Sequence, residues 1–441
     1  MTDVLCTLRL RRARNRASAL FCVATLALGA AVVVAQTRST PAPASQVAIA
    51  SESAAQIQRG EYLARAGDCI ACHTVRGGEA FAGGLAMTTR FGTLYTPNIT
   101  PDAETGIGKW RAEDFWQAMH YGRMPSGQPY YPAFPYDSYT RVSRADVDAI
   151  FAYLKSIQPV RSRNRPHDMA FPYSQRALLN GWRALYFEPG EFEPASTQTP
   201  EWNRGAYLVQ GLGHCDACHT GRNFLGATRR ADSFAGGVMP VQEWYAPSLT
   251  SSRESGLGQW EIDDLVAFLH AGVSRRGAAY GPMAQVIFDS LQYLTESDVR
   301  AMAVYLKSLV PRGAAELPTQ LKLTEQQGRE LYERGSKLYE RWCVDCHRSD
   351  GAGIPPAYPP LAGNQSITME SAVNPVRVVM FGGFPPVTAK NPRPFGMPPF
   401  AQSMNDDEIA AVVTYIRQSW GNRSLAVSAT DVGRYRSVPL E

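Results

Sequence analysis

The chain has 441 residues, 44% of them hydrophobic and 19% charged, a composition typical of a folded protein long enough for two to four domains. Its formal net charge is +4, and residues 1–35 account for it because they hold five Arg against Asp3. The rest of the chain is near neutral, which argues against nucleic acid as a partner.

The N-terminal segment has the pattern of a secretory signal peptide over residues 1–35. A cluster of arginines precedes an apolar run from residue 17, and small residues suit cleavage after Ala35. Cys6 and Cys22 would leave with this segment. An uncleaved anchor is the alternative, because the run is about long enough to span a bilayer. Both alternatives predict a periplasmic protein attached to the outer face of the cytoplasmic membrane.

The motif Cys-x-x-Cys-His occurs three times in the remaining chain. In c-type haem attachment, the two thiols add to porphyrin vinyl groups and the histidine supplies an imidazole to the iron. A zinc site would need paired ligand clusters, and a thioredoxin-like motif does not need the histidine. Three covalently bound haems c, and therefore electron transfer, are predicted. The attachment residues are Cys69, Cys72, Cys215, Cys218, Cys343 and Cys346, and the iron ligands are His73, His219 and His347.

One small helical domain is repeated around these motifs. Each copy begins with a helix that leads into the motif and closes with an amphipathic helix that has acids at its start and a base at its end. This pattern predicts an all-α protein of three tandem cytochrome c domains. The expected domains are residues 52–160, 201–311 and 325–422, followed by a polar C-terminal tail over residues 423–441.

Each copy carries Tyr-x-Pro after its motif. The proline carbonyl is expected to accept a hydrogen bond from the far ring nitrogen of the motif histidine, which would fix the ring. Ordinary turn prolines are the alternative. The expected acceptors are Pro97, Pro247 and Pro360.

Residues 161–200 connect the first two domains and are expected to be partly helical. The apolar stretch over residues 177–187 predicts a helix packed between the domains, because a flexible spacer would not need several large apolar side chains together. The haems would then be held in fixed relation. The residues concerned are Trp182, Leu185, Tyr186 and Phe187.

Methionine is the expected second axial ligand, because a thioether stabilises ferrous iron. Met397 lies in a proline-rich loop of the third copy, and Met283 follows Gly281-Pro282 in the second. The matching loop of the first copy holds Phe134, which cannot ligate iron. We expect Met124 to replace it, and a five-coordinate iron is the alternative. The weaker substitutes are Met119, Met87 and His120.

With these motifs, the chain resembles the three-haem cytochrome c subunits of bacterial membrane-bound dehydrogenases from about Gln56 to Asn422. Those enzymes act on alcohols, aldehydes, gluconate, fructose or sorbitol, and related subunits serve molybdenum hydroxylases. Some members have Met where this chain has Phe134, and their long C-terminal membrane-binding extension is not evident. The likeness is carried by residues 98–108, 131–136, 211–214 and 359–364.

The resemblance implies an electron conduit. A separate catalytic subunit of flavin, quinoprotein or molybdenum type oxidises the substrate, and the haems pass electrons to membrane ubiquinone or a terminal oxidase. No catalytic site is expected in this chain. The alternatives are a self-contained, peroxidase-like haem enzyme that uses an open first haem, and a soluble electron shuttle.

Overall fold

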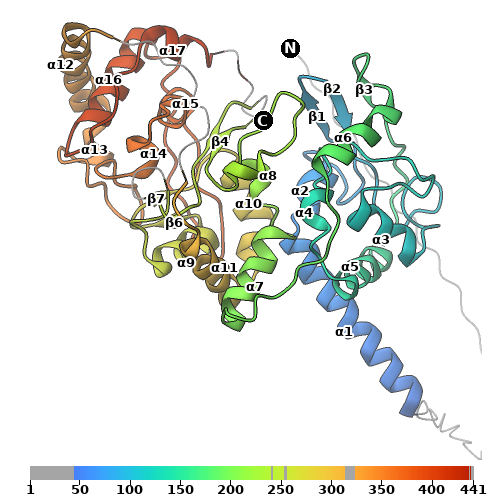
Figure 1. Ribbon diagram of the computed structural model, residues 1–441. Coiled ribbons are helices and arrows are strands. Elements are labelled where there is room, and N and C mark those ends of the chain that lie inside the picture. The colour runs from blue at the N-terminus through green and yellow to red at the C-terminus, as the bar shows by residue number, and fades with distance from the viewer. Residues whose placement is uncertain (1–43, 240–241, 253–255, 313–322, 437, 439–441) are drawn as a thin grey trace, which may run out of the picture. The chain divides into compact units, whose positions relative to one another are not determined.

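Helices make up most of the regular structure in the computed structural model, which describes residues 44–239, 242–252, 256–312, 323–436 and 438, with side chains from residue 53 (Figure 1). The α-helices are α1 (Ala44–Ala66), α2 (Cys69–His73), α3 (Ala112–Tyr121), α4 (Tyr136–Tyr139), α5 (Arg144–Ser156), α6 (Leu179–Tyr186), α7 (Pro200–Gln210), α8 (Asp216–His219), α9 (Ile262–Ala271), α10 (Pro282–Asp289), α11 (Glu296–Ser308), α12 (Glu325–Trp342), α13 (Val344–His347), α14 (Gln365–Thr368), α15 (Val373–Phe381), α16 (Asp406–Gln418) and α17 (Ala429–Gly433). The expected signal peptide lies outside the described residues.

The three expected closing helices are confirmed as α5, α11 and α16, and each begins at a side-chain cap. Ser143 Oγ, Thr295 Oγ1 and Asn405 Oδ1 each accept a hydrogen bond from the backbone N–H three residues later, at 3.3, 3.2 and 3.0 Å. Such caps satisfy N–H groups that have no partner inside the helix. The acidic residues in the first turn interact favourably with the positive end of the helix dipole.

A glycine in the first helix of each copy allows very close contact with the closing helix. A Cβ at Gly60, Gly205 or Gly335 would lie only 1.9, 1.9 and 2.0 Å from the carbonyl oxygens of Ala149, Ala301 and Ala411 respectively. Only glycine fits at that separation. The same helix crossing therefore occurs three times, once beside each Cys-x-x-Cys-His motif.

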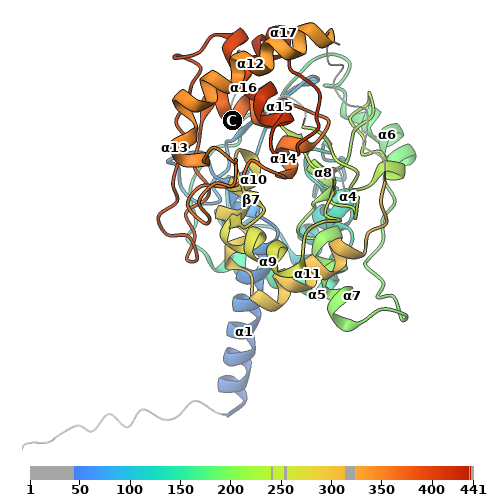
Figure 2. The ribbon, with the colours of Figure 1, turned by 90° about the vertical axis from the view of Figure 1, so that its left-hand side faces the viewer.

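The described hydrophobic core is divided into two clusters rather than three. One cluster joins residues of the first two copies, among them Leu63, Ile150, Leu208 and Val299. The second belongs mainly to the third copy. Figures 1 and 2 both show α12, α16 and α17 side by side, apart from the pair α7 and α11. The first two copies thus share one core, and the third has its own.

The protein is mostly helical, as expected, and a few short strands add to the helices. One antiparallel sheet has the order β1-β2-β3, and two further pairs are β4-β5 and β6-β7. With two to four residues each, these strands are too short for alternation to reveal them in the sequence. The strands are β1 (Ala86–Thr89), β2 (Gly92–Tyr95), β3 (Asp168–Met169), β4 (Gly237–Val238), β5 (Tyr245–Ala246), β6 (Val273–Ser274) and β7 (Gly277–Ala278).

The connector is partly helical, as expected, and α6 contacts both of the first two copies. Trp182 Nε1 donates a hydrogen bond to Leu225 O of the second copy at 3.0 Å. The Phe187 ring packs against Tyr136 of the first copy, with centroids 4.9 Å apart. Leu185 was expected to be packed, but it is 73% exposed because it lies on the outer face of this short helix.

The segment after residue 422 is not the polar tail that the sequence suggested. Val427, Val432 and Tyr435 are buried in the core of the third copy, and residues 429–433 form α17. The buried Arg417 donates a hydrogen bond to Leu425 O at 3.1 Å. These three apolar side chains pack the segment onto the third core, although its overall composition is polar. Within the described part of the chain, no helix combines the length and apolar character needed to cross a bilayer.

Candidate haem-binding sites

Each Cys-x-x-Cys-His motif forms a short helix directly after the first helix of its copy, at α2, α8 and α13. A residue with positive φ precedes the first two motif helices: Asp68 at 50° and His214 at 33°. These residues lie in the turn between the first helix of the copy and the motif helix. The cysteines and the histidine of one motif are confined to about one helical turn.

A proline carbonyl lies beside each motif histidine. The distance from Nδ1 to the carbonyl oxygen is 2.7 Å for His73 and Pro97, and 2.6 Å for His219 and Pro247. Both contacts confirm the expected acceptors. A carbonyl oxygen cannot donate, so Nδ1 carries the proton and the Nε2 lone pair is free to bind a metal.

In the third copy the acceptor is Pro359 and not Pro360. His347 Nδ1 lies 3.1 Å from Pro359 O, whereas Pro360 O accepts from Asn364 Nδ2 at 2.8 Å. Two backbone hydrogen bonds between Ile354 and Tyr358, both 2.9 Å long, close a short loop just before Pro359. That loop directs the carbonyl after Tyr358 toward the histidine.

A glycine that the sequence analysis missed holds each proline loop against its motif. Gly83, Gly236 and Gly353 have φ of 72°, 89° and 67°, and their N–H groups donate to the carbonyls of His73, His219 and His347 at 2.8, 2.8 and 3.2 Å. A Cβ at Gly83 would lie 2.5 Å from Pro97 O, and one at Gly353 would lie 2.6 Å from Pro359 O. The only signal in the sequence was a glycine at a different distance after each motif. Such a signal is too weak to identify these glycines without the structure.

Burial sets the protonation states of the motif side chains, and those of the histidines suit iron binding. Burial lowers the pKa of His73, His219 and His347, so the imidazoles are neutral near pH 7. Burial likewise raises the pKa of Cys69 and Cys215 to about 12, which keeps these thiols protonated. A thiolate metal site would need the opposite shift. Among the described residues, no group of three or more His, Cys, Asp and Glu could hold a metal ion.

The two expected methionine ligands lie in the same cores as their motifs. Met283, near the start of α10, is half-buried against the core that also contacts Cys215. Met397 is half-buried against the core that contacts Cys343. Two backbone hydrogen bonds with Gly383, of 2.8 and 3.0 Å, hold Met397 in a defined loop. Their ligation of iron stays a prediction.

In the first copy, Phe134 occupies the core beside the motif. It packs against the same core as Cys69, and its ring centroid lies 5.5 Å from that of Tyr139. Met124 is half-buried in a tight turn closed by a 2.8 Å hydrogen bond from Gly127 N to Met124 O. Met124 as the axial ligand therefore also stays a prediction.

The weaker substitutes have other places in the fold. Met119 is buried in the core on α3, and Met87 is half-buried in β1. The buried His120 stacks on Trp116, with ring centroids 4.2 Å apart. Met119 and His120 thus have packing roles that account for their burial.

Comparison with known proteins decides the family. The Cytochrome c family matches residues 57–158 and 332–420. The chain is 37% identical to the cytochrome c subunit of alcohol dehydrogenase (quinone) from Gluconacetobacter polyoxogenes, over 96% of this chain and 91% of the relative. It is 39% identical to the gluconate 2-dehydrogenase cytochrome c subunit of Pantoea cypripedii, over 89% and 92% respectively. This chain belongs to the cytochrome c subunits of bacterial dehydrogenases.

A third relative extends the comparison to another substrate class. The fructose dehydrogenase cytochrome subunit of Gluconobacter japonicus is 35% identical over 89% of this chain and 85% of its own length. As a cytochrome c subunit, the chain carries covalently bound haem c and transfers electrons in an oxidoreductase complex, which confirms the family predicted from the motifs. These relatives give no support to a self-contained haem enzyme.

Proposed function

We propose that the chain is built of three tandem cytochrome c domains that each bind one haem c, and that it relays electrons from a dehydrogenase catalytic subunit to a membrane acceptor. The observation that carries this proposal is the threefold repeat of one site. Each copy has a Cys-x-x-Cys-His helix, a proline carbonyl 2.6–3.1 Å from the histidine Nδ1, and a glycine-mediated helix crossing.

The residues of each copy have distinct tasks. The two cysteines tether the porphyrin, and the histidine presents Nε2 while the proline carbonyl holds its ring. Met283 and Met397 supply thioethers in the second and third copies. When bound, haem c supplies an iron that takes up and releases one electron. A histidine and a methionine would together hold the iron in these two copies, and such a ligand pair suits electron transfer rather than binding of small molecules.

A catalytic subunit that oxidises the substrate is the expected electron donor. The relatives are named as cytochrome subunits of alcohol, gluconate and fructose dehydrogenases, which supports a dehydrogenase catalytic subunit as the partner. We expect this partner to be of flavin, quinoprotein or molybdenum type. Ubiquinone or a terminal oxidase is the expected acceptor. This assignment requires a periplasmic protein at the outer face of the cytoplasmic membrane.

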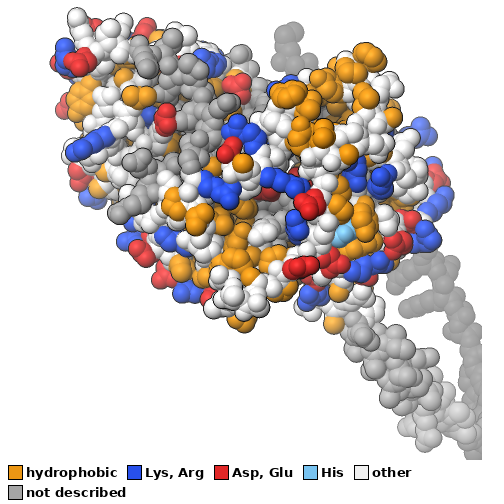
Figure 3. Space-filling model, in the orientation of Figure 1, with side chains coloured by type: hydrophobic (Ala, Val, Ile, Leu, Met, Phe, Trp, Pro, Cys, Tyr) orange, Lys and Arg blue, Asp and Glu red, His pale blue; other side chains and the backbone are white. Residues whose placement is uncertain are grey.

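The surface over β3 and α6 has the apolar character of a binding site for another protein. Apolar side chains gather there (Figure 3), and Phe171, Phe224 and Leu178 are more than half exposed. Exposed apolar patches of this kind mark protein interfaces. We assign this surface to the catalytic subunit, because the chain's relatives are subunits of dehydrogenases.

The proposal is tested by comparing the purified, exported chain with the complex isolated gently from membranes. Dithionite should reduce both samples. Alcohols, gluconate or fructose should reduce only the complex, because the chain has no dinucleotide-binding Gly-x-Gly-x-x-Gly motif after a strand. Turnover of such a substrate by the isolated chain would refute the proposed division of labour.

The first haem provides a separate test. We expect His73/Met124 ligation, so Met124→Ala should convert one low-spin haem to high spin in electron paramagnetic resonance spectra. Met169→Ala, which changes a half-buried methionine in β3 that is not a candidate ligand, is the control and should leave the spectrum unchanged. If the unmutated protein already contains a high-spin haem that binds carbon monoxide, the site is five-coordinate and Met124 is a packing residue.

A further inference from the structure

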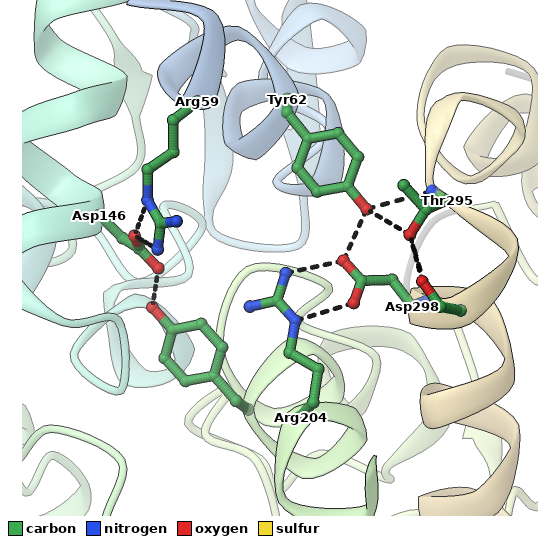
Figure 4. Close-up of polar contacts among 8 residues, drawn as sticks. Arg59, Tyr62, Asp146, Arg204, Thr295 and Asp298 are labelled. Carbon is green, nitrogen blue, oxygen red and sulfur yellow. Dashed lines mark hydrogen bonds and ion pairs between the residues drawn. The ribbon is translucent and has the colours of Figure 1, made fainter. Parts of the chain in front are cut away.

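Two tyrosines join the first two copies through reciprocal contacts (Figure 4). The Tyr62 hydroxyl on α1 donates to Asp298 Oδ2 on α11 at 2.6 Å and accepts from the backbone N–H of Thr295 at 3.1 Å. In the opposite direction, the Tyr207 hydroxyl on α7 donates to Asp146 Oδ2 on α5 at 2.6 Å. It also accepts from Ser143 N at 3.2 Å.

Each aspartate also binds an arginine of its own copy. Arg59 Nε donates to Asp146 Oδ1 at 2.8 Å, and Arg204 donates to Asp298 through Nε and Nη2 at 2.9 and 2.7 Å. The aspartate side chains are only 3% and 13% exposed. The carboxylates are thus shared between an arginine of the same copy and a tyrosine of the other, so the two halves of this interface are equivalent, as in a two-fold symmetric dimer.

The third copy has the arginine contact but lacks the tyrosine. It keeps the pair within the copy, with Arg334 Nη2 3.7 Å from Glu408 Oε1. However, it has the exposed Lys337 where the other copies have Tyr62 and Tyr207. Its contacts with the second copy are of another kind: Asn374 exchanges hydrogen bonds of 3.0 and 2.8 Å with the backbone of Tyr245. The tyrosines are therefore not needed for the fold of a single copy.

The same interface brings the first two motifs together. The Tyr139 ring of the first copy packs against the ring of His214, directly before Cys215 of the second copy, with centroids 5.7 Å apart. The same buried Tyr139 donates its hydroxyl to Gly67 O, two residues before Cys69, at 3.0 Å. Ser138 Oγ of the first copy lies 3.1 Å from Asp216 Oδ1 inside the second motif. The side chains of Leu63 and Leu212 belong to one core cluster. Any movement of the first copy against the second would therefore shift one motif relative to the other.

We propose that Tyr62 and Tyr207 form a reciprocal clasp that fixes the Cys69–His73 motif relative to the Cys215–His219 motif, so that the first two copies act as one rigid two-haem module. Both are positioning residues, since neither belongs to a motif. Only the purpose of the clasp in electron transfer rests on the proposed function. A fixed distance between two haems matters there, because electron tunnelling slows steeply with distance.

Hydrogen exchange at Ser143 N and Thr295 N in the full, haem-loaded chain tests the clasp. Thr295 N reports the contact made by Tyr62, and Ser143 N reports the contact made by Tyr207. If the two copies separate from each other as whole units, Tyr207→Phe raises exchange at Ser143 N and also at the distant Thr295 N. Tyr62→Phe likewise raises exchange at Thr295 N and also at the distant Ser143 N. We expect an increase of about tenfold at the distant amide, the factor that loss of a hydrogen bond to a charged group supplies.

Tyr131→Phe is the matched control. It also removes one phenolic hydroxyl, which donates to Tyr173 O at 2.9 Å away from the interface, and it should change neither amide. The clasp is overturned if each variant changes only its own amide, or if the control raises both. Each single variant keeps the other tyrosine contact, so the two single variants together decide the question. The haem content of the same samples tests the proposed function independently.

Discussion

Gly335→Ala destabilises the third copy, whereas Gly328→Ala in the same helix leaves it equally or slightly more stable. A Cβ at Gly335 would lie 2.0 Å from Ala411 O and 2.8 Å from the Tyr415 Cβ, so the two helices must move apart. A Cβ at Gly328 meets no atom within 4 Å. Alanine stabilises an exposed helix by about 0.5–1 kcal/mol relative to glycine, while overpacking costs about 1–3 kcal/mol.

The gain from alanine applies to both variants, so they should differ by the overpacking cost, about 1–3 kcal/mol in the free energy of unfolding of this copy. Thermal or denaturant unfolding of the haem-loaded chain, followed at the third haem, measures the difference. Gly60→Ala and Gly205→Ala should have the same effect in their own copies. Equal stability of Gly335→Ala and Gly328→Ala would mean that α12 and α16 do not cross this closely.

Met283→Leu and Met397→Leu each remove one thioether and leave the side-chain volume nearly unchanged. Each variant should lose one haem's worth of thioether-to-iron absorbance and lower the potential of that haem, because the stabiliser of ferrous iron is gone. Axial ligands shift haem potentials over a range of about 0.8 V, so a large shift is expected. A redox titration followed by absorbance measures it.

Met404→Leu is the matched control in the third copy. Met404 is buried in the same core as Met397 but is not an expected ligand. It should leave all potentials unchanged, although it disturbs the core. Identical titrations of the unmutated protein and the Met283→Leu and Met397→Leu variants would refute the ligand assignment.

Local patterns in the sequence were sufficient for the motifs, the closing helices and two of the three proline acceptors. The closing helices were predictable because their caps and apolar spacing lie within one short segment. The third acceptor was assigned to Pro360 and not Pro359, because the choice depends on a loop closed between Ile354 and Tyr358. That closure leaves no mark in the spacing of the prolines.

Contacts between segments far apart in the chain could not be predicted from the sequence. The pattern Arg-Gly-x-Tyr is visible at Arg59 and at Arg204, yet it does not show that each tyrosine binds an aspartate of the other copy. Likewise, the apolar residues after position 422 gave no sign that they complete the third core. Both features depend on packing between parts of the chain that sequence periodicity treats separately.

Intact-protein and peptide mass spectrometry of the exported chain tests the three-haem assignment most directly. The account predicts three covalent haem additions, one each on the peptides that contain Cys69 and Cys72, Cys215 and Cys218, and Cys343 and Cys346. With the signal peptide removed, the chain should begin near Gln36. Fewer than three haems, or a motif peptide with free thiols in the mature protein, would contradict the account.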